Sequence, residues 1–490
     1  MVIASVTIRF SAATWIAFIW ALGWLLVLGL RVPLGVPGEW TWDYRGDARF
    51  DPFGILLTIL ALMGLCALAG REGKHPVKRR HFLWGALLLL TVFRTTVALL
   101  LPMGWGPAPL FWALVIASPI ATSFYDEARN LQQQGLRTYL RYYHEQLPAK
   151  PFHAATHPPG LPMLFALWRQ IGLHPVLQRL VPIGQEELLV MRRIYQRIFP
   201  PLKSDTLYPT DADLKAAWWV AVFCLACGIL AALLWAWYWV RETGRVAPVA
   251  LVATTPATLW WQPTTDSIHF LVIMLVFVSA WQWERHRSWG WAFLTGTMAG
   301  VALWLAFKNA VPLACISLWL LWAHWKEKSR IPFLQGLTVV LLTLAPYLLA
   351  WLLAGFQPLE TLMVAREAHH VQAGAHARSY LPWLLVNLAD WAMGLGGGWL
   401  GLTLVALVHW WREGRFPSLT IATLVVLLGL NFSGLVRGEA ARLWLPLIPL
   451  FVWEGRKHLP ENGHELALMA FLQGGLAIAL QLRLEFLRPF

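Results

Sequence analysis

The chain has 490 residues, of which 58% are hydrophobic and only 13% are charged, and its formal net charge is +13. Soluble proteins carry about 25% charged residues, so this composition excludes an ordinary soluble enzyme and indicates a polytopic helical membrane protein. The positive charge is explained by Lys and Arg beside the helix ends. No basic stripe lies on a soluble domain, so nothing supports nucleic-acid binding.

Apolar segments recur from one end of the chain to the other. Because a spanning helix needs roughly 20 apolar residues, the sequence predicts an all-α fold with about 13 transmembrane helices. The predicted spans are Ser11–Leu30, Phe53–Gly70, Phe82–Leu101, Leu214–Val240, Ala247–Thr264, Ser267–Trp283, Trp289–Phe307, Asn309–Trp325, Pro332–Ala354, Gly396–Trp411, Pro417–Gly434, Ala440–Trp453 and Glu465–Leu482. Two N-terminal helices with an outer loop (residues 1–81) precede a core (82–490) that carries a large outer loop (102–213).

Short basic loops predict the orientation, because Lys and Arg are enriched on the cytoplasmic side. They fall on one side only if two shorter apolar pieces, 107–124 and 158–172, are not independent spans, so we expect both pieces at the outer surface. The sequence thus predicts a multi-pass protein of the cell inner (plasma) membrane, whose chemically unusual loops face outside or toward the periplasm. The six loops lie at residues 71–80, 241–245, 285–287, 326–330, 412–415 and 456–458.

The most unusual polar stretch runs from Tyr125 to Gly160 in the predicted outer loop. It opens with YDEAR, which contains Asp126 and Glu127, and closes with THPPG, which contains His157. The two acids could simply favour the dipole of a helix N-terminus. Ionisable residues beside hydrocarbon are costly and tend to be functional, so we expect a general base here. THPPG is either a plain turn or a helix start that binds phosphate.

Two further charged residues stand between apolar runs on the same predicted face. Asp266 could cap the following helix or face the same cavity as Asp126. Lys308 follows a long apolar run and could either snorkel toward water or neutralise a phosphate.

A second charged cluster lies in the run RGEAARLW, which holds Arg437, Glu439 and Arg442. The planar fork of arginine suits phosphate, and an ion pair with Glu439 is the structural alternative. The loop at 366–380 adds Arg378 and Tyr380, either as an ordered lid or as a solvated loop.

The order YDEA, THPPG, the distant Asp266 and then RGEAARLW resembles the GT-C superfamily of bacterial membrane glycosyltransferases. The likeness is to the group that includes polyprenyl-phosphate-sugar-dependent protein mannosyltransferases and lipid A aminoarabinose transferases, and it covers the chain from about residue 82 onward. THPPG is similar to that group's HPP or KPP step. Asp126 lies where their first outer loop carries the catalytic acid. The order of the motifs is more specific than any one of them.

The resemblance implies an inverting transfer of one sugar from a polyprenyl-phosphate donor to a hydroxyl of a lipid, glycan or protein. Asp126 or Glu127 would accept the hydroxyl proton, and Asp266 would orient the acceptor or a cation. Positioned cations would hold the lipid phosphate. The expected substrate-binding residues are His157, Lys308, Arg378, Tyr380, Arg437, Glu439 and Arg442.

The chain departs from the family in its two extra N-terminal helices and in lacking a large outer C-terminal domain. Its extra outer loop makes Asp43 a rival base, and spacing alone does not decide between the acids. No residue is assigned to a metal, although a divalent metal stays possible. The competing functions are a transporter or flippase of a lipid-linked or anionic solute, and a lipid-linked glycan polymerase or ligase.

Overall fold

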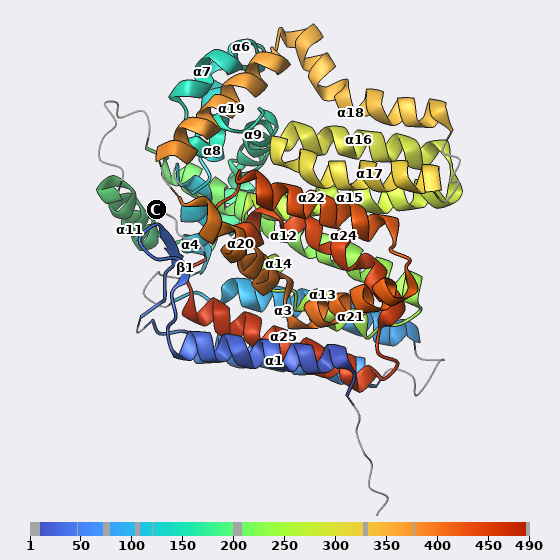
Figure 1. Cartoon of the computed structure of the whole chain (residues 1–490). Helices are drawn as coiled ribbons and strands as arrows, with labels where there is room; N and C mark the ends of the chain where they lie inside the picture. The colour runs from blue at the N-terminus through green and yellow to red at the C-terminus, as the bar shows by residue number, and fades with distance from the viewer. Residues whose placement is uncertain are drawn as a thin grey trace, which may run out of the picture.

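The computed structural model describes residues 10–46, 48–71, 79–102, 108–119, 121–198, 208–326, 332–375 and 378–486. Regular structure in these ranges is almost entirely helical, and one antiparallel pair of strands joins β1 (Leu34–Val36) to β2 (Trp40–Trp42). In Figure 1 the long helices run side by side across the view, whereas the short helices around α8 and the hairpin gather at one end of the bundle.

The helices up to residue 198 are α1 (Ala12–Gly29), α2 (Pro52–Gly70), α3 (Arg79–Leu99), α4 (Ala108–Ala117), α5 (Phe124–Gln134), α6 (Leu136–Arg141), α7 (Tyr143–Gln146), η3 (Leu147–Ala149), α8 (Phe152–Ala155), α9 (Gly160–Gly172), α10 (Pro175–Leu180) and α11 (Gln185–Ile198). The next are α12 (Asp211–Thr243), α13 (Pro248–Ala253), α14 (Ala257–Trp260), α15 (Thr265–His286), α16 (Trp289–Leu305), η5 (Phe307–Asn309), α17 (Ala310–Lys326) and α18 (Phe333–Ala354). The last are α19 (Pro358–Ala375), α20 (Tyr380–Leu395), α21 (Gly397–Glu413), α22 (Ser418–Ser433), α23 (Ala440–Leu443), η6 (Leu445–Leu447), α24 (Ile448–Val452), η7 (Trp453–His458) and α25 (Gly463–Arg483).

Several of these helices have the length and the apolar composition of membrane-spanning helices. Within the described ranges, 7 helices are long and apolar enough to cross a membrane, or up to 8 if the bent pair α20–α21 is one span. The helical membrane class expected from composition is therefore confirmed, whereas the larger predicted number of spans stays a prediction. Within the described residues of the pieces 107–124 and 158–172 lie α4 and α9, which have 10 and 13 residues. The expected place of both pieces at the outer surface stays a prediction.

Two predicted spans are not continuous helices, and proline explains both breaks. Segment 247–264 divides into α13 and α14, because the residue before Pro256 is biased away from helical geometry. Segment 440–453 divides into α23, η6, α24 and the start of η7, with Pro446 and Pro449 inside the run. Both broken segments are buried among the longer helices. The non-helical backbone that they create is thus covered by protein, as membrane proteins require.

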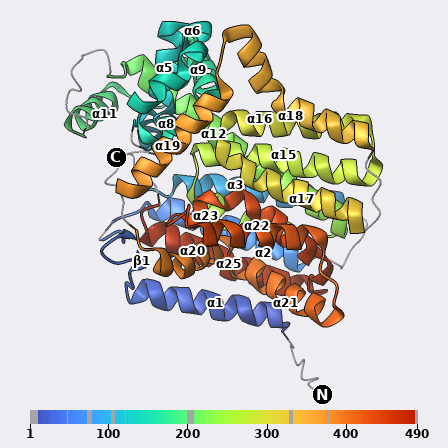
Figure 2. The same cartoon turned by 45° about the horizontal axis from the view of Figure 1, so that its top comes forward.

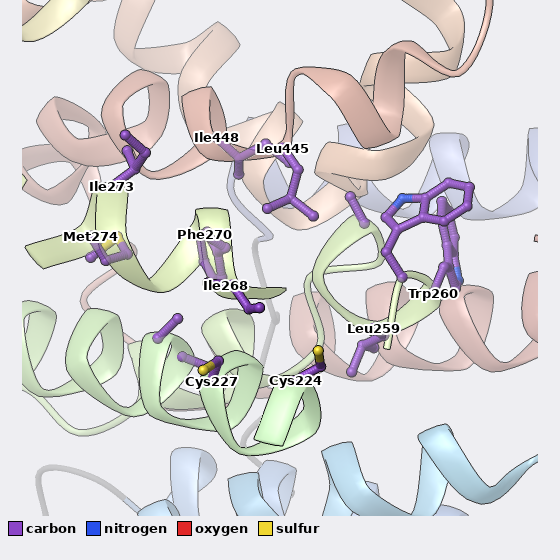
Figure 3. Close-up of a cluster of buried hydrophobic side chains, with 14 of the residues drawn as sticks. Cys224, Cys227, Leu259, Trp260, Ile268, Phe270, Ile273, Met274, Leu445 and Ile448 are labelled. Atoms are coloured by element: carbon purple, nitrogen blue, oxygen red, sulfur yellow. The ribbon is translucent and has the colours of Figure 1, made fainter. Parts of the chain in front are cut away.

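The core forms where α12 packs against α15. Figure 3 shows Cys224 and Cys227 of α12 near Ile268 of α15, with Leu445 and Ile448 of the broken segment on the other side of α15. All of these side chains are buried, and the two cysteines are free thiols. The central helix α15 is therefore covered on two sides, and its two ends lie at opposite ends of the bundle.

The C-terminal end of α15 lies among basic loops that the sequence placed on one side. Arg285 pairs with Glu242 at 2.6 Å, and Arg245 donates to the carbonyl of Glu461 at 3.1 Å. Arg415 and Arg456 line the same pocket. Four of the six basic loops therefore lie together, while most of the other two, at 72–78 and 327–330, lies outside the described residues. Which side is cytoplasmic stays a prediction.

At the opposite end, the N-terminal loop pairs with the end of the described chain. Arg45 donates its backbone N–H to the carbonyl of Arg483 at 2.7 Å, and Glu485 donates to that of Asp43 at 3.0 Å. The hairpin above them requires glycine at Gly35, because its φ is positive and a Cβ there would lie 2.2 Å from the carbonyl oxygen of Trp40. Figure 2 shows β1 at the same end as α8 and α11.

Candidate active site

Three residues that are far apart in sequence meet at the start of α15. Asp266, in its first turn, is 3% exposed. Its two carboxylate oxygens accept from Lys308 Nζ at 2.7 Å and from Arg442 Nε at 2.8 Å. Lys308 comes from η5 and Arg442 from α23. The structure thus brings together three of the predicted site residues, and it places Asp266 as the anchor of two cations.

Arg442 is held from two further sides. Its Nη1 pairs with Glu439 at 3.2 Å, and its guanidinium lies 5.5 Å from the ring centroid of Trp261. Glu439 has a left-handed backbone conformation, which is uncommon for a residue with a side chain and costs free energy. Such strain is found mainly at functional sites. The bonds to Asp266 and Glu439 engage Nε and Nη1 of Arg442, and the Arg442 side chain also lines the cavity beside the cluster.

A cavity of about 470 Å³ opens beside Arg442. One arginine, one histidine, four carboxylates and three aromatic rings share its surface. The lining residues are Gly38, Glu39, Trp40, Thr41, Trp42, Asp43, Val115, Ala121, Thr122, His153, Thr264, Glu439, Arg442, Glu485 and Phe486. The cavity therefore joins the N-terminal hairpin, the end of the described chain and the short helices of the large outer loop.

Two histidines stand near this cluster as neutral groups. Burial lowers the pKa of His153 to about 3, and the nearby Arg442 and Lys308 act in the same direction. Burial likewise lowers the pKa of His157 to about 3, with Lys308 and His153 adding to the effect. His157 is not among the residues that line the cavity. A neutral imidazole offers a phosphate a hydrogen bond rather than a charge. Because His157 does not line the cavity, its substrate-binding role stays a prediction.

Asp126 lies in the first turn of α5, one turn after the cavity-lining Thr122. Its carboxylate is 3.5 Å from Arg129, and 20% of its side chain is exposed. Burial raises the pKa of Asp126 to about 7, although Arg129 acts in the opposite direction. A carboxyl group with this pKa is half ionised near neutral pH, which suits a general base. Asp126 does not itself line the cavity.

Glu127 is engaged in a buried ion pair. Its carboxylate pairs with Lys150 and also accepts from the Tyr139 hydroxyl at 3.0 Å. The Lys150 ammonium lies 4.2 Å from the ring centroid of Tyr143, whose hydroxyl donates to the carbonyl of His157 at 2.9 Å. Glu127 therefore ties α5 to α6 and to the residue that follows η3, and the structure does not bring it to the cavity.

Breaking this pair is expected to destabilise the protein strongly. Lys150→Met would leave Glu127 buried without its cation, at a cost of about 3–5 kcal/mol. Thermal unfolding in detergent would measure the loss. Lys457 is the matched control, because 62% of its side chain is exposed. Lys457→Met is expected to change the stability by less than about 0.5 kcal/mol. Equal stability of the two variants would contradict the structural role.

Arg378, Tyr380 and Arg437 form a clamp rather than a part of the cavity. Arg378 and Arg437 each donate to the other's backbone carbonyl. The Tyr380 hydroxyl donates to the carbonyl of Phe432 at 2.5 Å, and the Arg437 guanidinium lies 5.8 Å from the Tyr380 ring centroid. These bonds join the start of α20 to the end of α22 and to the loop before α23. None of the three residues lines the cavity, so their expected contact with substrate stays a prediction.

Several cavity residues were missed from the sequence. The sequence marks Asp43 only as a rival base, and no motif points to Trp40, Trp42, Glu485 or Phe486 as cavity residues. A signal was available for the hairpin, because Pro-Gly followed by alternating Trp-x-Trp is typical of a turn and a strand. No local sequence pattern marks Glu485 and Phe486 as cavity residues. Within the described ranges, no group of three or more His, Cys, Asp or Glu side chains could hold a metal ion.

Comparisons with protein-family models, with curated proteins and with solved structures gave no match. The likeness to GT-C enzymes therefore depends on the sequence motifs alone.

Proposed function

We propose that this protein is an integral-membrane glycosyltransferase that moves a sugar from a polyprenyl-phosphate donor to an acceptor hydroxyl at the outer membrane face. The observation that carries the proposal is the Asp266–Lys308–Arg442 cluster beside a cavity otherwise rich in carboxylates and tryptophan. Such a cavity has one end suited to a phosphate and another suited to a polyhydroxylated group. The order of the GT-C-like motifs supports the same reaction.

Arg442 is the residue that we assign to the donor phosphate. Asp266 and Glu439 occupy its Nε and Nη1 groups, which fixes the guanidinium plane and directs Nη2 away from them. A positioned cation of this kind stabilises the charge that develops on a departing phosphate. Asp266 acts through Arg442 and Lys308, so its role is to position cations rather than to take a proton.

We assign Asp126 as the base for the acceptor because of its raised pKa and its place in the YDEA motif, and it lies one turn beyond the cavity-lining Thr122. The acceptor oxygen forms a bond to the anomeric carbon while the bond from that carbon to the phosphate oxygen breaks, with inversion. The hydroxyl proton passes to Asp126, and the bonding electrons leave with the polyprenyl phosphate. One carboxylate suffices, because phosphate leaves without needing a proton, whereas a glycoside hydrolase needs a second carboxyl group.

The rate of transfer is expected to follow the ionisation of Asp126. Its pKa of about 7 predicts a rate that rises about tenfold per pH unit below pH 7 and levels off above it. Membranes that contain the protein would be supplied with radiolabelled undecaprenyl-phosphate mannose, glucose or arabinose, and sugar transfer would be measured from about pH 5 to about pH 9. Membranes without the protein are the control. Absence of transfer with every donor and acceptor extract would overturn the proposal.

A flippase for a lipid-linked solute is the second candidate, and the bend between α20 and α21 favours it. The two helices meet at 109° across Gly396, and transporters often use broken helices at their substrate sites. Movement of a fluorescent polyprenyl-phosphate lipid across vesicles, without any sugar transfer, would favour this function over the first.

A further inference from the structure

We propose that the N-terminal hairpin forms the sugar-binding wall of the cavity, which makes it the element that selects the donor sugar. This inference rests on the proposed function. Residues 38–43 line the cavity without interruption and carry Glu39, Trp40, Trp42 and Asp43 into its surface. They belong to the segment that departs from the GT-C pattern, so the family resemblance assigns them no role.

The chemistry of the hairpin suits a sugar and disfavours a phosphate. Carboxylates accept hydrogen bonds and cannot donate them when ionised, so Glu39 and Asp43 match sugar hydroxyls and repel phosphate oxygens. The ring centroids of Trp40 and Trp42 lie 4.5 Å apart, and the two rings offer an apolar surface with rigid geometry. The cation that attracts phosphate is Arg442, which also lines the cavity. A sugar phosphate is therefore oriented with its phosphate at Arg442 and its ring at the hairpin.

The wall is held in place before any ligand binds. One carboxylate oxygen of Glu39 accepts from the Ser379 backbone at 2.8 Å and from Trp383 Nε1 at 2.7 Å. At the base of the hairpin, the carbonyl of Asp43 accepts from the backbone N–H of Glu485. The hairpin thus has fixed partners beside α20 and at the end of the described chain, and a binding surface gains affinity from such preorganisation.

Asp390 fixes the distance between the sugar wall and the phosphate cation. This buried residue of α20 accepts from Trp42 Nε1 at 3.2 Å and from the backbone of Ala441 at 3.1 Å. Ala441 directly precedes Arg442 in α23. A single carboxylate therefore holds both parts of the donor site, which is the arrangement needed to recognise a sugar and its phosphate together.

Kinetics of a hairpin variant test the inference when transfer is observed. Trp40→Leu keeps an apolar side chain but removes the ring, and it is expected to raise the KM for the sugar donor by on the order of tenfold. Inhibition by undecaprenyl phosphate, which lacks the sugar, should stay unchanged. Trp40→Phe should recover part of the affinity, and Trp15→Leu, at a 53% exposed position of α1, is the control. Equal weakening of both lipids, or an unchanged KM, would overturn the inference.

A labelling experiment separates failure of this inference from failure of the proposed function. Thr41→Cys places a thiol on the hairpin at the cavity, and wild type, whose four cysteines are not cavity residues, gives the background for maleimide labelling. Undecaprenyl-phosphate mannose, glucose or arabinose should slow the reaction of this thiol, whereas undecaprenyl phosphate should not. Sugar-dependent protection in a protein that transfers nothing would keep the wall and reject the transferase. Sugar transfer together with equal protection by both lipids would reject the sugar-binding wall and keep the transferase.

Discussion

Asp126→Asn is expected to lower the rate of sugar transfer by about 10²–10⁴-fold, the usual contribution of a general base. Asparagine is nearly the same size but cannot accept the proton, so donor binding should persist. The measurement is transfer of labelled sugar in membranes, with protein amount determined in parallel. Asp43→Asn is the matched variant, because Asp43 lines the cavity. Full activity of Asp126→Asn, together with an Asp43→Asn variant that loses kcat while its KM for the donor is unchanged, would move the base to the hairpin loop.

The same Asp126 variant should be more stable than the wild type at alkaline pH. The folded protein holds the Asp126 proton up to about pH 7, whereas an unfolded chain releases it near 3.8. Ionisation therefore opposes folding as the pH rises through this window, and asparagine avoids that cost. We expect a gain of about 1–3 kcal/mol at about pH 8 and little change at about pH 4. A higher melting temperature with lost activity would exclude misfolding as the reason for inactivity.

Arg442→Met is expected to have the second largest effect, because it removes the phosphate cation and also a partner of buried Asp266. Donor affinity should fall by about 100-fold, as is typical when a charged hydrogen-bonded partner is lost. Asp266 would keep only Lys308 of its two cations, so stability should fall by about 3–5 kcal/mol. Competition by undecaprenyl phosphate measures the first effect, and thermal unfolding in detergent measures the second.

A double variant separates the two roles of Arg442. Adding Asp266→Asn to Arg442→Met removes the buried charge that the single variant leaves poorly paired, so part of the stability should return. Donor affinity should not return, because no cation faces the cavity in its place. Recovery of affinity in the double variant would show that Arg442 acts only through the fold.

The sequence predicted the helical membrane class and a larger common site at the outer face, of which Asp266, Lys308 and Arg442 meet in the structure. Both follow from the apolar runs. Long apolar runs report directly on burial in lipid. Each of the three charged residues stands at an end of an apolar run on the same predicted face, so topology alone brings them to one end of the bundle. Among the described residues, Asp266 then supplies the one buried carboxylate that both Lys308 and Arg442 contact.

The role of Glu127 could not be predicted from its neighbourhood in the sequence. YDEAR presents two adjacent acids, and adjacent residues on a helix point in different directions. Asp126 remains partly exposed, whereas Glu127 turns toward Lys150 and is 4% exposed. Lys150, whose ion pair distinguishes Glu127 from Asp126, directly follows η3. Its position depends on how the short helices α5–α8 fold back. No local pattern reports such tertiary pairing.

The cavity walls were hidden for a similar reason. The ring centroids of Trp42 and Phe486 lie 5.2 Å apart, although the two residues are near opposite ends of the described chain. Contacts of such large sequence separation leave no periodic pattern. The hairpin has only three residues in each strand, and its Pro-Gly and Trp-x-Trp pattern indicates a turn and a strand but not that these side chains line a cavity.

The pairing of Asp43 with Glu485 also has a consequence for biogenesis. The loop that carries Asp43 is synthesised before α2, whereas its partner segment emerges from the ribosome only after α25. Membrane insertion of the intervening helices therefore proceeds while this edge of the pocket is unfinished. A nascent chain that has not passed α25 lacks the closing segment, so we expect the pocket to assemble only after α25 and the residues up to Glu485 have been made.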